Sequence, residues 1–259
     1  MKTRRFIVFF VILAGICAFP ADCAGINNLT VINKIYKIVC DIDEEKAVGE
    51  TEPENIKDKP GKKYIALTFD DGPHPKYTGR IINILAEKNA PATFFIVGDR
   101  GELHPTLLRR IKQANCEIGN HTYNHIDLSK VSRDEFINQI EKCNRAIYNA
   151  TGEYPKVYRP PFGRISKANE QYLGGKMKKI LWTVDSHDWN TQDKNKIVRQ
   201  VVSSAKDKAI ILMHDFYSQS VDALPDILDE LKQQGYEFVT VSELIKRREL
   251  PARMEYFIN

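Results

Sequence analysis

The fold class of this chain is decided by the stretch Tyr64-Ile65-Ala66-Leu67-Thr68-Phe69-Asp70-Asp71-Gly72-Pro73. Its first six residues form a short, mostly apolar run that predicts a buried strand. Two adjacent carboxylates and a Gly-Pro break follow the strand at once, and a helix is expected over about residues 77–88. This order of strand, polar loop and helix is the first of several similar units along the chain.

Short apolar strands alternate with amphipathic helices from residue 63 onward. The pattern predicts further strands at residues 92–97, 117–119, 157–159, 179–184, 209–213 and 237–241. Predicted helices include residues 105–115, a helix that begins at Ser132 as its N-cap, and residues 222–234 ending at Gly235. Repeated units of this kind favour an α/β fold with a parallel sheet, either a barrel of about seven units or an open doubly wound sheet. No glycine-rich phosphate loop follows a strand, which disfavours nucleotide binding.

The N-terminus has the layout of a secretory signal. Met1 to Arg5 is basic, residues 6–19 are apolar apart from Gly15, and small residues follow Pro20. The apolar run is shorter than the roughly 20 residues of a spanning helix, but an uncleaved membrane anchor stays open as an alternative. We therefore expect an exported protein, extracellular or in the cell envelope, with a signal peptide or anchor at 1–24, a linker at 25–60 and one folded domain at 61–250.

The amino-acid composition indicates which classes of binding partner are expected. The chain has 259 residues, 42% of them hydrophobic, and a net charge of +4. Without residues 1–25 it keeps 35 basic and 33 acidic side chains, a balance that gives no reason to expect nucleic acid as a partner. Cys40, Cys116 and Cys143 lie beyond the leader; one disulfide is possible, but buried unpaired thiols are the preferred interpretation. We expect a monomer.

Five polar motifs each follow a predicted strand. They are Asp70-Asp71-Gly72-Pro73, His121-Thr122-Tyr123-Asn124-His125, Arg159-Pro160-Pro161-Phe162-Gly163, Asp185-Ser186-His187-Asp188-Trp189 and Leu212-Met213-His214. Each has an ordinary explanation when taken alone, such as a solvated turn or a structural histidine. Because the carboxyl ends of parallel strands meet at one edge of a sheet, five such motifs together predict an active site there.

The histidine motif predicts a metal site. If its segment is helical, the imidazoles of His121 and His125 share one face at i and i+4, so both reach the same ion. Two histidines and one carboxylate leave open coordination positions, as a hydrolytic metal site requires.

The five motifs in this order resemble those of the polysaccharide deacetylases, carbohydrate esterase family 4, over about residues 61–248. The resemblance implies a distorted (β/α) barrel with fewer than eight units and removal of N-acetyl groups from an amino-sugar polymer. It implies a divalent metal, zinc first with cobalt, manganese or nickel as alternatives, held by Asp71, His121 and His125. It also implies a role for each of the following residues: Asp70 as general base, His214 as general acid, Asp185 to keep His214 charged, Arg159 to position Asp70, the Phe162 N–H for the oxyanion, and Trp189 and Leu212 around the acetyl methyl.

The substrate that we expect from the sequence is the N-acetylglucosamine of peptidoglycan. Chitin oligosaccharides and N-acetylmuramic acid are alternatives within the same chemistry, and another N- or O-acyl group is a third. A non-catalytic sugar-binding protein is disfavoured, because no catalytic residue type is lost. His187 receives no role, and the glycosylation sequon at Asn120 is interpreted as accidental because a glycan would crowd the metal.

Overall fold

The computed structural model describes residues 58–59, 61–173 and 177–247, all within a unit that spans Glu54–Asn259. The expected leader and most of the expected linker lie outside the described residues, as does Cys40. Among the residues described, no helix combines the length and the apolar character needed to cross a bilayer.

The strands form one parallel sheet. Seven of them follow the order β5-β4-β3-β2-β1-β7-β6, and β8 pairs separately with the first residues of β1. The strands are β1 (Lys63–Asp70), β2 (Thr93–Ile96), β3 (Glu117–Asn120), β4 (Val157–Tyr158), β5 (Lys178–Lys179), β6 (Val184–Asp185), β7 (Ile210–His214) and β8 (Tyr236–Phe238). This arrangement confirms the predicted distorted α/β barrel.

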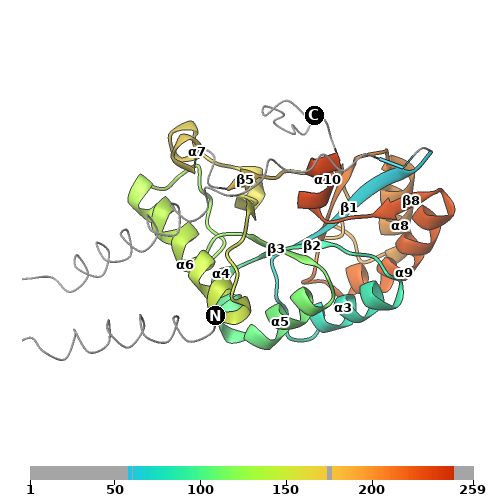
Figure 1. The fold of residues 1–259 in the computed structure, drawn as a ribbon, viewed down its shortest axis with the longest axis horizontal. Coiled ribbons are helices and arrows are strands. Elements are labelled where there is room, and N and C mark those ends of the chain that lie inside the picture. Colours follow the sequence, from blue (N-terminus) through green and yellow to red (C-terminus); the bar gives the residue numbers. More distant parts are fainter. Residues whose placement is uncertain (1–57, 60, 174–176, 248–259) are drawn as a thin grey trace, which may run out of the picture. The chain divides into compact units, whose positions relative to one another are not determined.

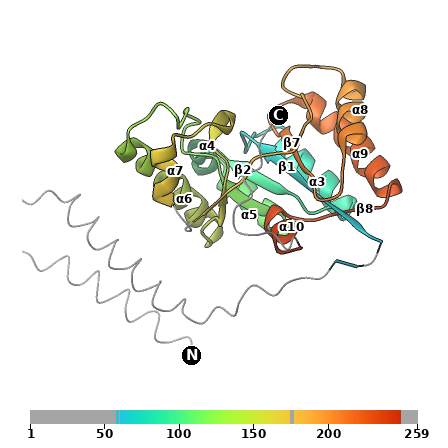
Figure 2. The ribbon, with the colours of Figure 1, turned by 90° about the horizontal axis from the view of Figure 1, so that it is seen from above.

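Helices connect the strands and pack around the sheet, with β1 and β2 near the middle of the views in Figures 1 and 2. They are α3 (Thr78–Glu87), α4 (Gly98–Leu103), α5 (Pro105–Gln113), α6 (Arg133–Thr151), the 3-10 turn η1 (Pro161–Gly163), α7 (Lys167–Leu173), α8 (Lys194–Ser204), α9 (Ser218–Gln233) and α10 (Val241–Arg247). The helices expected after β1 and after β2 are confirmed to within two residues, whereas α9 begins four residues earlier than predicted.

Helix α6 begins as its sequence predicts. The Ser132 hydroxyl accepts a hydrogen bond from the Glu135 N–H, which satisfies one of the free donors of the first turn. The helix ends at Gly152, whose φ of 76° is the left-handed conformation that glycine adopts at little cost.

The strand predicted over residues 179–184 is wrong, because β5 and β6 are two separate short strands. Between them, the carbonyls of Ile180 and Leu181 accept hydrogen bonds from the Arg159 guanidinium, at 3.2 Å each. A side chain thus takes the place of a neighbouring strand as their partner. The predicted strand 237–241 is also too long, since α10 already begins at Val241.

Side chains of β1 alternate between two apolar clusters, as the period of a strand requires. Ile65, Leu67 and Phe69 pack among side chains of the surrounding helices. Tyr64 and Ala66 pack in a second cluster made mainly of residues from the strands and their ends. Thr68 and Asp70 continue this second row and therefore lie on the strand-lined side, where polar groups are expensive to bury unless they are paired.

Cys116 and Cys143 are buried and free, as expected for thiols that act as small apolar side chains. Burial raises the pKa of Cys116 to about 11, so its unreactive thiol form prevails at neutral pH.

A prediction follows from the close packing between β2 and β3. A Cβ at Gly119 would lie 2.5 Å from the ring of buried Phe95, so Gly119→Ala must displace that ring. We expect a loss of about 1–3 kcal/mol in the free energy of unfolding, measured by urea denaturation. Gly101→Ala, whose nearest neighbour lies at 3.2 Å, is the control with the smaller loss. Equal stabilities of the two variants would contradict this packing.

Candidate active site

The five motifs meet at the carboxyl edge of the sheet, as the sequence predicts. Asp70 is the last residue of β1 and Asp71 follows it, the histidine motif follows β3, Arg159 follows β4, Asp188 follows β6, and His214 is the last residue of β7. The register fixes two of these positions, because Asp70 of β1 lies directly opposite His214 of β7. The sheet therefore brings acidic, basic and imidazole groups together from five different strands.

The segment that carries His121 and His125 is a loop and not the helix that would have placed them on one face. The side chains converge all the same, because Thr122 and His125 adopt positive φ values of 66° and 60°. Such values are uncommon outside glycine. The Asn120 side-chain oxygen accepts from the Thr122 N–H at 2.8 Å and helps to fix this turn.

Helix α6 holds the same loop from outside. The Gln139 Oε1 atom accepts hydrogen bonds from the N–H groups of Tyr123 and Asn124, at 3.0 and 3.1 Å. Asn120 is fully buried, and its amide donates to the Ile140 carbonyl. A glycan on Asn120 is thus incompatible with this fold, in agreement with the interpretation of the sequon as accidental.

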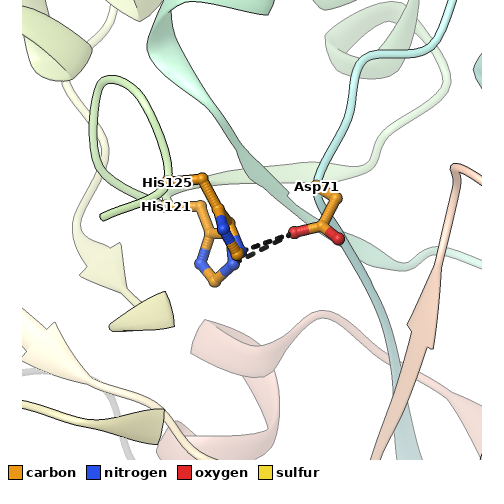
Figure 3. A group of neighbouring side chains, drawn as sticks. All are labelled: Asp71, His121 and His125. Carbon is orange, nitrogen blue, oxygen red and sulfur yellow. Dashed lines mark ion pairs between the residues drawn. The ribbon is translucent and has the colours of Figure 1, made fainter. Parts of the chain in front are cut away.

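Asp71, His121 and His125 offer ligand atoms that all lie within 4.8 Å of one another. The Oδ1 atom of Asp71 is 3.0 Å from His125 Nε2 and 3.5 Å from His121 Nε2, and both rings point toward it (Figure 3). This oxygen is buried and has no hydrogen-bond partner among the described residues. A buried carboxylate oxygen without a donor, facing two imidazoles, fits a divalent cation.

The tautomer of His121 is the one that a metal ligand requires. Its Nδ1 atom lies 2.7 Å from the Arg159 carbonyl oxygen, which can only accept, so Nδ1 carries the proton. Nε2 then presents its lone pair to Asp71 and to a shared ion. Burial acts to raise the pKa of Asp71, but hydrogen bonds and charge from His121 and His125, when these rings are protonated, outweigh it and hold that pKa well below its usual range. A cation bound in place of those protons would act in the same direction, so the carboxylate is ionised in either case.

Asp70 is nearly buried and contacts a fully buried cation. Its Oδ1 accepts from Arg159 Nη1 at 2.6 Å, whereas Oδ2 lies 3.8 Å from His121 Nε2. The same Nη1 donates to the Thr68 hydroxyl at 2.8 Å, and the guanidinium lies over the Phe95 ring at 4.2 Å. Burial lowers the pKa of Arg159 and the charge of Asp70 raises it, so each ion makes the burial of the other tolerable. The expected Arg159–Asp70 contact is therefore present.

The carboxylate beside His214 is Asp188, and the expectation that Asp185 has this place is wrong. Asp188 Oδ1 lies 2.7 Å from His214 Nδ1, and Oδ2 accepts from the His214 N–H at 2.8 Å. Asp185 instead accepts from the N–H of His187 at 2.8 Å and closes a tight turn. That turn carries the chain back so that Asp188, three residues later, faces His214.

The pKa of His214 is raised in this environment. Burial alone would lower it, but the hydrogen bond and charge of Asp188, with the charges of Asp70 and Asp71, raise the pKa of His214 to about 9. The ring is therefore protonated at neutral pH and holds its Nδ1 proton toward Asp188. This leaves the Nε2 proton for transfer.

The remaining predicted residues lie around this centre. Phe162 has a φ of 60°, and its exposed ring meets His125 edge-on at 4.9 Å between centroids. Leu212 is buried two residues before His214 on β7, in the strand row that faces the interior. Trp189 follows Asp188 directly and leaves 53% of its surface exposed, as a side chain at the rim of a site would.

Asp215 is a buried carboxyl group of the site that the sequence motifs did not predict. Burial raises the pKa of Asp215 to about 7, even though its Oδ2 accepts from the Thr78 hydroxyl at 2.5 Å. The carboxyl packs against Gly72, where a Cβ would lie 2.0 Å from that oxygen. Only a residue without a side chain fits there, which explains the glycine directly after Asp71. The only sequence signal for Asp215 is its position after His214.

The family model and the similar proteins of known function agree on one family. The family model described as polysaccharide deacetylase matches residues 57–174. A peptidoglycan-N-acetylglucosamine deacetylase of Bacillus cereus is 40% identical over 191 residues, which cover 71% of this chain and 89% of the relative. PgdA of Listeria monocytogenes, of the same description, is 38% identical over 205 residues, covering 79% of this chain.

A third relative, the peptidoglycan-N-acetylmuramic acid deacetylase PdaC of Bacillus subtilis, is 41% identical over 186 residues, covering 71% of this chain. Its solved structure superposes with a TM-score of 0.70 over 73% of this chain and 93% of that chain. The matches span only 43% of the length of PgdA and 39% of PdaC. By sequence and by structure, this chain belongs to the polysaccharide deacetylase family.

Proposed function

We propose that this protein hydrolyses the N-acetyl groups of N-acetylglucosamine residues in peptidoglycan and releases acetate. The observation that carries the proposal is the cluster of Asp71, His121 and His125 beside two further groups, an Arg-bound carboxylate and a protonated imidazole. These groups offer a metal site, a general base and a general acid. Amide hydrolysis uses all three, because water must be activated and the departing amine must receive a proton.

A divalent cation, with zinc as our first choice, would be held by Asp71 Oδ1 and the Nε2 atoms of His121 and His125, and it would supply Lewis acidity. Support for this assignment comes from the unpartnered Asp71 oxygen and from the protonated Nδ1 of His121. Asp70 is kept for another role, because Arg159 already occupies its Oδ1.

Asp70 Oδ2 acts as the general base in this proposal. It takes a proton from a water molecule whose oxygen forms a bond to the acetamide carbon. Arg159 fixes the carboxylate through Oδ1, so that Oδ2 is the oxygen available for the proton. The negative oxygen that develops on the acetamide carbon would accept a hydrogen bond from the backbone N–H of Phe162, and Trp189 and Leu212 would surround the methyl group.

His214 acts as the general acid. Its Nε2 proton passes to the sugar nitrogen as the carbon–nitrogen bond breaks, giving acetate and a free amine. The Nδ1–H bond to Asp188 holds the ring in place and keeps it protonated before the transfer. Asp185 supports this arrangement from a distance, through the turn that positions Asp188.

The choice of peptidoglycan follows the descriptions of the relatives, and N-acetylmuramic acid or chitin oligosaccharides are the alternatives. We further propose an exported protein with a signal peptide or anchor at 1–24, a linker at 25–60 and the catalytic domain at 61–250, acting as a monomer. A non-catalytic sugar-binding protein is disfavoured, because the base, the acid and all three candidate ligands are present.

The first prediction concerns the metal. His125→Ala and Asp71→Asn should each weaken zinc or cobalt binding by about 100-fold or more, since changes to groups behind the ligands already cost 10- to 100-fold. Isothermal titration of the metal-stripped full chain measures this directly. Asn124→Ala, in the same loop but outside the cluster, is the control. Unchanged metal affinity in both ligand variants would contradict the assignment of Asp71 and His125 as metal ligands.

The second prediction concerns the base. Asp70→Asn should lower the rate of acetate release from peptidoglycan by about 10²- to 10⁴-fold, because it removes the proton acceptor. Metal binding should persist, since Asp70 is not one of the proposed ligands. An Asp70→Asn enzyme with full activity would refute this role, whereas loss of the metal along with activity would make Asp70 a ligand.

The third prediction separates the two acidic residues of the fourth motif. His214 has a pKa of about 9 and must be protonated to act, so activity falls as the pH rises through about 9. In Asp188→Asn this fall should move to lower pH, because the hydrogen bond and charge that raise the pKa are lost. Asp185→Asn should move it much less. NMR titration of the His214 ring checks the shift independently of activity, and a larger shift in Asp185→Asn would reverse the assignment.

A further inference from the structure

A group of aromatic and basic side chains lies beside the candidate active site and has no place in the proposed chemistry. It consists of His74, Lys76, Tyr77, Arg100 and Phe216, which we call the cationic aromatic surface. His74 stacks on Tyr77 with 4.5 Å between ring centroids and meets the Phe216 ring edge-on at 4.9 Å. These residues come from the loop after β1, from the start of α4 and from the loop after β7, so the fold brings them together.

Both cations of this surface lie over aromatic rings. The Arg100 guanidinium is 4.6 Å from the centre of Phe216, and the Lys76 ammonium is 5.3 Å from that of Tyr77. Phe216 leaves 37% of its surface exposed and Lys76 is exposed. The result is an accessible apolar platform with positive charge at its edge.

The surface is continuous with the candidate reaction centre. Arg100 donates a hydrogen bond to the backbone carbonyl of Asp71, one of the proposed metal ligands. On the other side, Tyr217 lies 6.1 Å from Phe216 and 5.8 Å from the ring of His214, measured between centroids. A polymer that places an acetamide beside His214 would therefore extend across this surface with its neighbouring residue.

The positive charge here is not neutralised by an ion pair. Within the described part of the chain, no carboxylate forms an ion pair with Lys76 or Arg100. The pKa of His74 is lowered by burial and then by the charges of Arg100, His104 and Lys76, which shows how closely these basic groups gather. Positive groups without a close ion-pair partner beside a binding site favour an anionic ligand.

The basic side chains near Trp189 and Phe162 differ from Lys76 and Arg100 in having carboxylate partners. Trp189 lies next to His187, whose Nδ1 is 3.4 Å from Asp185, and Arg164 beyond Phe162 is 3.9 Å from Asp127. These two basic groups are thus already near carboxylates. A substrate with one acidic neighbour would be bound with that neighbour toward Phe216.

We infer that the cationic aromatic surface binds a carboxylate carried by the residue next to the sugar that is deacetylated, and so favours muramic acid-containing strands over chitin. This inference rests on the proposed function and adds the feature that selects the polymer. The carboxylate has two possible sources in peptidoglycan, the lactyl group of a strand without peptides and the acidic groups of an attached stem peptide.

The test compares four substrates with the metal-loaded full chain, measuring acetate release. They are a tetrasaccharide of alternating N-acetylglucosamine and N-acetylmuramic acid with free carboxylates, the same compound with its carboxyl groups converted to methylamides, the same compound carrying stem peptides, and uncharged chitotetraose. The wild type should show a kcat/KM about two- to fivefold higher for the free acid than for the methylamide, the range of one exposed ion pair. This preference should fall at high salt.

Charge variants identify the surface. Lys76→Gln should reduce the acid-to-methylamide ratio, and Lys76→Glu should bring it to one or below, while the rate on chitotetraose stays unchanged. Lys206→Gln is the matched control, because this exposed lysine precedes β7 and lies at the opposite edge of the sheet. Arg100 is left intact because of its contact with Asp71.

Each outcome has a distinct meaning. A preference for the free acid that depends on Lys76 assigns the lactyl carboxylate, and a preference seen only with the peptide-bearing compound, again dependent on Lys76, assigns the stem peptide. Equal rates on all charged and uncharged compounds, or a preference that Lys76→Glu does not change, would overturn the inference. Failure to release acetate from any of the four substrates would instead contradict the proposed function.

Discussion

The site depends on one buried ion pair, between Arg159 and Asp70. A guanidinium with no exposed surface is tolerable only because each of its three nitrogens donates to an acceptor, and Asp70 supplies the charged one. The other acceptors are the Thr68 hydroxyl and the carbonyls of Ile180 and Leu181, so the same residue also joins β1 to the segment between β5 and β6. The residue that fixes Asp70 therefore also holds separate parts of the sheet together.

Two histidines lie on either side of this pair, and their hydrogen-bond partners give them different protonation states. On one side, the Arg159 carbonyl fixes the His121 tautomer and turns its Nε2 toward Asp71, where a buried carboxylate oxygen has no donor among the residues that the structure describes. On the other side, Asp188 holds His214 in the protonated state. One imidazole is therefore kept as a neutral ligand and the other as an acid, although both are close enough to Asp70 and Asp71 to interact with their charges. The backbone and carboxyl partners behind the two rings make this difference.

The sequence predicts most of the strands, the capped helix at Ser132 and the gathering of five motifs at one edge, because these follow from periodicity and from the direction of parallel strands. It does not distinguish Asp185 from Asp188, since both carboxylates flank a turn whose path depends on the positive φ of His187. It also cannot show that His125 converges through turns rather than through a helix. The prediction that His121 and His125 lie close together is confirmed, but a loop and not a helix brings them together.

The measurement that tests this account most directly is an anomalous diffraction experiment on crystals of the protein grown with zinc. The account predicts one strong peak bonded to Asp71 Oδ1 and to the Nε2 atoms of His121 and His125, at about 2.0–2.2 Å. Asp70 should remain on Arg159 and outside the coordination sphere. A peak bonded to Asp70 in place of Asp71, or no peak at this edge of the sheet at saturating zinc, would contradict the division between metal ligand and base on which the proposed chemistry rests.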